Sequence, residues 1–176
     1  MLLRKINAAF SLIVSFLVLD HAIFLSVWML SGGGIEKTMN YMPWIMTGLT
    51  VIHALISIDL GVSAHRGLPK QKVNSYSRLN APTIIQRMSG ILMLVFTALH
   101  VTGAAGLMTP PTAVHMVVPP LFFAIVLVHV GISVSKAFIT LGIGSARFVR
   151  VFDVVVKIVC ALTLVAATVG FYLNQC

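Results

Sequence analysis

The sequence has very little charge. Only 9% of its 176 residues are Asp, Glu, Lys or Arg, whereas 59% are hydrophobic. A soluble domain needs more charged surface than this, so a soluble globular fold is excluded. Apolar runs of about 20 residues, long enough to cross ~30 Å of hydrocarbon, recur at about 8–30, 43–64, 83–107, 117–138 and 151–172.

These runs predict an all-α integral membrane protein. Backbone polar groups in lipid must find partners within the chain, which favours five transmembrane helices over strands. The links between the runs are short, so consecutive helices should be antiparallel neighbours in an up-down bundle. Glycines and prolines mark the links, among them Pro110-Pro111, Pro119-Pro120, Gly142 and Gly144. We expect residues 1–176 to form a single transmembrane domain.

Acidic residues are scarcer than basic ones. The chain has 4 Asp or Glu and 12 Lys or Arg, for a formal charge of +8. The basic residues flank the apolar runs on one side, which the positive-inside rule explains without a nucleic-acid partner. The N-terminus is therefore expected in the cytoplasm and the C-terminus outside. The first run is too long for a signal peptide, contains Asp20 and His21, and is expected to be retained as a span.

Cysteine is also scarce. Cys160 lies in the fifth run and Cys176 at the end of the chain, and no C-x-x-C or C-x-x-C-H pattern is present. The sequence therefore supports neither covalent c-type haem attachment nor a zinc site. The chain also has no flavin motif, no cysteines for an iron-sulfur cluster and no dicarboxylate site.

Histidines, in contrast, are numerous for a membrane protein. Four of the six lie inside the apolar runs, one in each of the first four: His21, His53, His100 and His129. One such histidine could simply bond a neighbouring carbonyl or hydroxyl. Four on separate helices favour iron ligation, because two facing imidazoles can hold a haem without burying a charged ligand. His65 and His115 fall outside the runs and are expected to be solvated.

The depth of each histidine predicts the pairs. At 1.5 Å per residue, His21 and His100 lie about 20 and 25 Å from the inner membrane surface, whereas His53 and His129 lie at about 17 and 14 Å. Axial ligands of one haem must lie at similar depth. We therefore predict an outer haem between His21 and His100 and an inner haem between His53 and His129, which together could conduct electrons across the membrane.

Other polar residues in the runs are candidates for supporting roles. Arg87, at the inner end of the third run, could pair with a haem propionate or simply anchor the helix at the membrane surface. Ser89 could bond a propionate or cap the helix. Asp20 and Glu36 are among the few protonatable groups near the outer end and are candidates for a quinone site, although a solvated loop carboxylate is an alternative for Glu36.

The remaining charges predict ion pairs. Asp153 and Lys157 are four residues apart on one helix and should neutralise each other. Asp59, near the inner end of the second run, should pair with Lys136, Arg87 or Lys157.

Three stretches resemble a known family. QRMSGILMLVFTALH, in which Arg87 precedes His100 by 13 residues, is similar to the third helix of the cytochrome b membrane anchor of succinate:menaquinone reductases and quinol:fumarate reductases. VIHALISIDLGV around His53 resembles the second helix of that family, and HVGISVSKAFITLGI after His129 resembles the fourth. LVLDHAIF around His21 agrees in little beyond the histidine. The resemblance covers most of the first four helices.

The resemblance implies a function for the whole chain. Members of this family carry two haem b groups, with helix one paired to three and helix two to four. They pass electrons between menaquinone or another quinone and an iron-sulfur and a flavoprotein subunit at the cytoplasmic face of a prokaryotic inner membrane. A dimer of heterotrimers could form. Some members have a glutamate two residues before the fourth-helix ligand, where this chain has Leu127, so proton movement by that route is not expected.

Three alternatives stay open on the sequence alone. The chain could be another dihaem cytochrome b, such as a hydrogenase or nitrate reductase anchor or a b561-type reductase. It could also be a proton-coupled transporter that uses histidines without haem, or a structural anchor. A transporter of this size usually needs an internal repeat, and none is visible.

Overall fold

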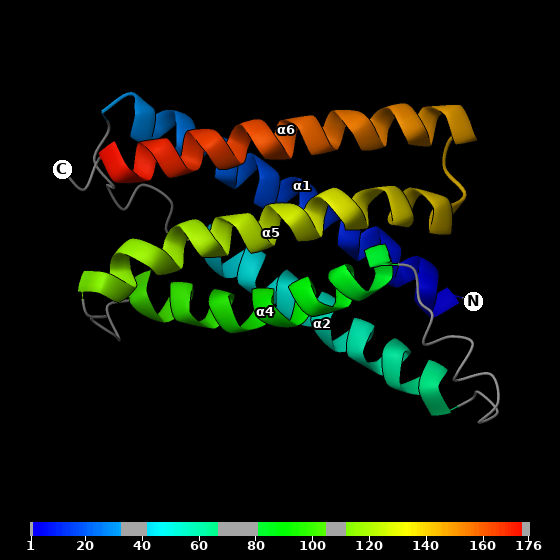
Figure 1. Ribbon diagram of the computed structural model, residues 1–176. Helices are drawn as coiled ribbons and strands as arrows, with labels where there is room; N and C mark the ends of the chain where they lie inside the picture. The colour runs from blue at the N-terminus through cyan, green and yellow to red at the C-terminus, as the bar shows by residue number, and fades with distance from the viewer. Residues whose placement is uncertain (1, 33–41, 67–80, 105–111, 174–176) are drawn as a thin grey trace.

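The chain folds into long helices. The computed structural model describes residues 2–32, 42–66, 81–104 and 112–173 (Figure 1), and within these ranges it is helical except for short turns. The helices are α1 (Leu2–Leu30), α2 (Met42–Arg66), α4 (Ala81–Ala104), α5 (Thr112–Leu141) and α6 (Ala146–Leu173). All five are long and apolar enough to cross a membrane. The predicted all-α, five-helix architecture is confirmed.

The helices extend beyond several predicted ends. The predictions placed the first, fourth and fifth helices at 8, 117 and 151, but α1, α5 and α6 begin at Leu2, Thr112 and Ala146. Charged residues such as Arg4 and Arg147 lie within these extensions. A helix can carry such side chains just outside the apolar layer, because they extend into the headgroup region. Apolar length therefore predicts the part of a helix that crosses lipid and not its full extent.

The prediction that Pro119 and Pro120 mark a link is wrong, because both lie inside α5. Proline has no backbone N–H, so Pro120 leaves the carbonyl oxygen of Met116 without its usual helical donor. The Tyr172 hydroxyl of α6 donates to that oxygen at 3.2 Å. A neighbouring helix thus supplies the missing hydrogen bond, which is how transmembrane helices tolerate proline.

The turn between α5 and α6 follows the sequence prediction. Gly142 and Gly144 both have positive φ angles, +72° and +82°, which L side chains rarely adopt. Gly142 N–H donates to Ile139 O at 3.2 Å and Ile143 N–H to Phe138 O at 3.1 Å, so a Schellman motif ends α5. The Ser145 hydroxyl then accepts from Phe148 N–H at 3.2 Å and caps α6.

The core lies where α5 packs against its neighbours. α5 contacts α1, α4 and α6, and α6 also packs along α1. Helix α2 is peripheral: it packs on α1 and makes few contacts with α4. It runs obliquely to the α4 and α5 helices (Figure 1). The buried core cluster comes from α4, α5 and α6 and comprises Met93, Val126, Leu127, Val130, Val134, Val156 and Cys160.

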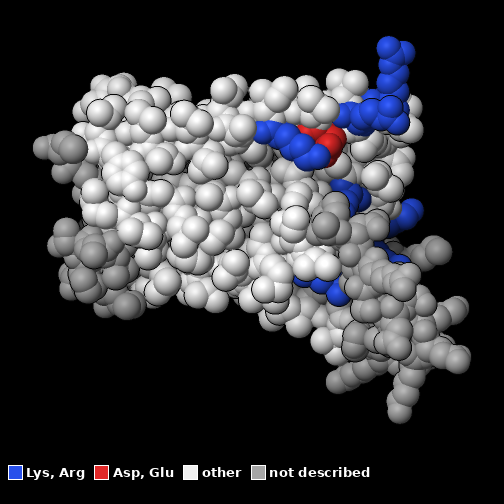
Figure 2. Space-filling view, viewed as in Figure 1, with Lys and Arg blue, Asp and Glu red and all other residues white. Residues whose placement is uncertain are grey.

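Charge is concentrated at one end of the bundle. The described Lys and Arg side chains gather at the end where the N-terminus lies, and the opposite end is free of them in the view of Figure 2. The predicted pair of Asp153 and Lys157 is confirmed, with 2.5 Å between Nζ and Oδ2. The predicted pairing of Asp59 is wrong: its side chain is exposed, and no ion pair within the described ranges includes it.

Candidate functional site

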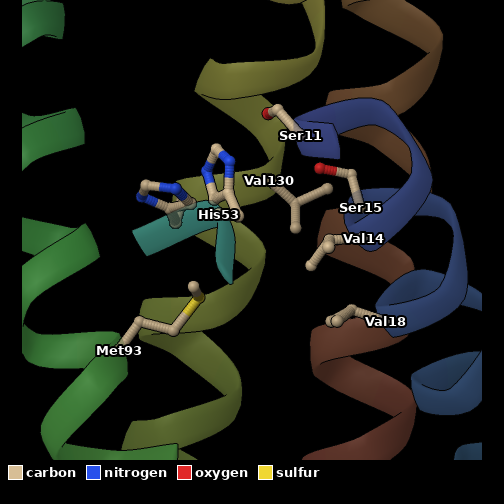
Figure 3. Close-up of a pocket in the computed structure, with 8 residues that line it drawn as sticks. Ser11, Val14, Ser15, Val18, His53, Met93 and Val130 are labelled. Atoms are coloured by element: carbon tan, nitrogen blue, oxygen red, sulfur yellow. The ribbon is translucent and has the colours of Figure 1, made fainter. Parts of the chain in front are cut away.

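His53 and His129 line one small cavity. Its wall is formed by four helices: Ser11 and Ser15 come from α1, His53 from α2, Met93 from α4 and His129 from α5. In Figure 3 the α1 side chains approach from one side, and His53 and Met93 lie on the other. The helix packing therefore brings together the two histidines that were predicted to form the inner pair.

The His129 ring is held in one tautomer. Its Nδ1 lies 3.1 Å from the backbone carbonyl oxygen of Gln86 and 3.0 Å from Ser89 Oγ on α4. A carbonyl oxygen only accepts, so Nδ1 carries the hydrogen and donates it, while the Ser89 hydroxyl donates to the same carbonyl at 3.1 Å. Nε2 is then unprotonated and has a free lone pair. Ligating histidines in proteins are commonly fixed in this way.

Helix α4 approaches this ring closely because Gly90 lacks a side chain. A Cβ at Gly90 would lie 3.1 Å from His129 Cε1, which is tighter than an ordinary contact. Ser89 itself is buried, with 6% of its surface exposed. The Gln86 to Gly90 segment therefore forms a close-fitting wall against His129.

His53 has an unsatisfied polar atom. Its Nδ1 is buried and lacks a hydrogen-bond partner among the described residues, although the ring also interacts with the backbone of Asn7. One turn further along α2, the Ser57 hydroxyl exchanges hydrogen bonds of 3.1 and 3.2 Å with the Asn7 side chain of α1. This pair fixes the face of α2 that carries His53 toward α1. A buried ring nitrogen without a partner is costly unless a ligand binds it.

The histidine ligands of this cavity suit a haem iron, but the cavity is too small to hold a porphyrin ring. Two neutral imidazoles on separate helices are the ligand pair that bis-histidine haem requires. The cavity holds only about 10 Å³, close to one water molecule, whereas sites for bound organic molecules enclose about 300 Å³ or more. Haem would therefore fit only if the helices around the cavity moved apart, and α2 is the helix with the fewest tertiary contacts.

His21 and His100 are the predicted outer pair. They lie on α1 and α4. The His100 ring packs against Phe122 of α5, with ring centroids 5.2 Å apart, and Phe96 stacks on the same phenyl group at 6.3 Å. Neither imidazole makes a hydrogen bond to any residue that the structure describes, which is unfavourable in lipid. His53 and His129 share a cavity, whereas the pairing of His21 with His100 and iron ligation at both sites stay predictions.

A polar cluster joins α4 to α5 beside the inner pair. Gln86 Nε2 donates to Ser133 Oγ at 3.0 Å, and Lys136 Nζ donates to Gln86 Oε1 at 2.7 Å. With the backbone bond to His129, Gln86 contacts three residues of α5. Sequence reasoning assigned no role to Gln86 or Ser133. The signal was the spacing of His129, Ser133 and Lys136, which lie on one face of a helix at i, i+4 and i+7.

The other predicted residues are placed as follows. Arg87 is exposed at the basic end, next to Lys136. Ser89 contacts His129 and Gln86, so its hydroxyl already has partners. Asp20 is exposed beside His21. Glu36, and the side chains of His65 and His115, lie outside the described residues. The propionate and quinone roles of these residues stay predictions.

The histidines meet in pairs and not in larger groups. Within the described residues, no cluster of three or more His, Cys, Asp or Glu side chains is arranged to hold a bare metal ion. Comparison of the chain with protein-family models, with curated proteins and with solved structures gave no match. The function must therefore be argued from the residues and their geometry.

Proposed function

We propose that this chain is the haem-b membrane anchor of a succinate dehydrogenase or fumarate reductase complex. It would bind two bis-histidine haems, one between His21 and His100 and one between His53 and His129. Electrons would pass through them between a membrane quinone, menaquinone or a relative, and iron-sulfur and flavoprotein subunits. The chain would be the electron-transfer part of an oxidoreductase whose other catalytic parts are separate subunits.

The observation that carries this proposal is that two intramembrane histidines, His53 of α2 and His129 of α5, line one cavity. The proposed pairs join different helices, α1 with α4 and α2 with α5, and each histidine is a polar group that is costly in lipid without a partner. At the inner pair, the hydrogen bond from His129 Nδ1 to Gln86 leaves Nε2 available to a ligand, and Nδ1 of His53 has no hydrogen-bond partner in the described part of the chain. Haem iron would supply one-electron chemistry at such a pair. The chain would orient the imidazoles and exclude water from them.

The charge distribution supports an orientation. The end with the N-terminus carries the described Lys and Arg side chains, so under the positive-inside rule it faces the cytoplasm of a prokaryotic cell. The soluble subunits would dock at this basic end. The quinone would react near the outer pair, where Asp20 is a protonatable neighbour. A dimer of such heterotrimers is part of the same proposal.

The test is the optical spectrum and haem content of the purified chain. Two low-spin haems per chain are expected, with the bis-histidine signature in the reduced-minus-oxidised difference spectrum. His100→Ala and His129→Ala should each lower the haem content to about one, because one axial ligand of one haem is lost. His115→Ala, which lies outside the candidate pairs, is the matched control and should retain both haems.

Three results would contradict the proposal. A chain purified after expression with sufficient haem synthesis could contain no haem, which would favour a histidine-bearing transporter or a structural anchor. The double variant His21→Ala with His100→Ala could also lose both haems, which would show that the pairs are assigned incorrectly. Finally, two haems with no succinate or fumarate activity in the purified native complex would favour another dihaem cytochrome b.

A further inference from the structure

A second and larger cleft lies at the basic end of the molecule. It opens between the last turns of α5 and the first turns of α6 and has a volume of about 540 Å³. Its walls include the apolar side chains of Phe138, Ile139, Ile143 and Val149. Ile139 is 68% exposed and Ile143 46% exposed. The cleft therefore offers an apolar surface at the level where the helices leave the membrane.

One cation in this cleft is not neutralised. The Asp153 carboxylate, which also lines it, is paired with Lys157 and accepts a hydrogen bond from the Ser135 hydroxyl. Arg150 lines the same cleft, and among the residues described here it forms no ion pair. The guanidinium of Arg150 is thus free to bind an anion, while the acid beside it is already satisfied.

The surroundings of Arg150 indicate which class of anion would bind there. It lies one turn into α6, at the end of the bundle where the positive side chains gather (Figure 2), so the local potential is positive. Arginine binds phosphate with two parallel hydrogen bonds. Basic pockets between transmembrane helices at the cytoplasmic side are suited to anionic lipid headgroups, and the adjoining apolar wall can hold an acyl chain.

We propose that this cleft binds one anionic phospholipid, with the headgroup phosphate on Arg150 and an acyl chain against Ile139 and Ile143. A quinone ring is neutral and would leave the arginine charge unpaired. The proposal does not depend on haem, because none of the cleft residues belongs to the histidine pairs.

The experiment compares lipid retention by the full-length chain. The protein is purified in detergent, incubated with phosphatidylglycerol or phosphatidylcholine, and examined by native mass spectrometry. One tightly retained phosphatidylglycerol per chain is expected. Arg150→Gln should weaken this binding by about tenfold or more, because a bidentate phosphate contact is lost. Arg147→Gln is the matched control: Arg147 is exposed three residues earlier and does not line the cleft.

Several outcomes would overturn the proposal. Equal loss in Arg150→Gln and Arg147→Gln would show that charge alone attracts the lipid to this end of the protein. Equal retention of phosphatidylcholine by the unaltered chain would show that the headgroup charge is not recognised, and this arm requires no variant to fold. Displacement of the bound lipid by a water-soluble quinone, or by inorganic phosphate at millimolar concentration, would assign the cleft to those ligands instead. Circular dichroism of both variants checks that the helices are retained.

Discussion

Replacing Ser89 with Ala tests whether α4 positions His129 for a ligand. The Ser89 hydroxyl lies 3.0 Å from His129 Nδ1 and donates to the Gln86 carbonyl oxygen at 3.1 Å. After its removal the ring can still donate Nδ1–H to that carbonyl at 3.1 Å. The tautomer is therefore kept, but the ring loses one of its two neighbours on this side.

The magnitude follows from this geometry. Loss of one neutral hydrogen bond in a buried site should lower the free energy of unfolding by about 1 kcal/mol. Removal of a group that orients a metal ligand typically lowers affinity by about 10- to 100-fold. We expect the lower end of that range, about tenfold for haem at the inner pair, because the carbonyl bond remains.

The assay requires a protein with a single haem. In a His100→Ala background only the inner haem is expected, so haem titration followed by absorbance reports that site alone. Thr140→Ala in the same background is the matched control, because the Thr140 hydroxyl bonds the carbonyl of Lys136 in its own helix at 2.8 Å. If Ser89→Ala and Thr140→Ala bind haem with affinities within about twofold of each other, Ser89 does not position the ligand.

Two glycine substitutions test close contacts elsewhere in the bundle. Gly90→Ala should reduce stability or haem binding by about 1 kcal/mol, because the added Cβ would lie 3.1 Å from His129 Cε1. Gly144→Ala should lower the free energy of unfolding by about 1–2 kcal/mol, because φ is +82° there and the methyl group would collide with the Phe148 ring. Gly48→Ala, with nothing within 4 Å, is the control for both. Unfolding by a denaturing detergent, followed by circular dichroism, measures all three, and losses equal to that of the control would contradict these contacts.

The helices could be predicted because lipid leaves the backbone few choices. Apolar runs of sufficient length fix where the chain crosses the membrane, and all five appear in the structure. Their ends were less predictable, since Arg4 and Arg147 lie in helical turns outside the apolar layer. Pro119 and Pro120 were misinterpreted because their effect depends on a partner, the Tyr172 hydroxyl, that approaches from another helix.

The depths of His53 and His129 along their helices predict that the two lie close together, and both line one cavity. The residues that support His129 could not be predicted in this way. Gln86 accepts the His129 hydrogen bond through its backbone carbonyl. Because every residue has such a carbonyl, the residue type at position 86 does not predict this bond. Whether the Gln86 side chain reaches Ser133 and Lys136 depends on the rotation of α4 against α5. The pairing predicted for Asp59 was wrong because depth alone does not place two side chains in contact, and the Asp59 side chain is exposed.

Helix α2 connects the packing of the bundle with the proposed cofactor. Most of its large apolar side chains are exposed, Leu55 by 62% and Ile58 by 54%, and Thr50 is the only described residue of α2 that is buried. In lipid such exposure costs little, so α2 can stand away from α4 and α5 without penalty. Ser57 ties it to Asn7 on α1 by hydrogen bonds between the two side chains. A flat cofactor bound to His53 and His129 would join α2 to α5 through two metal bonds and supply the contacts that α2 lacks. Because α2 is loosely packed, its displacement would widen the small cavity at the least cost in packing. A haem between any two of the closely packed helices α1, α5 and α6 would instead require the core to be broken.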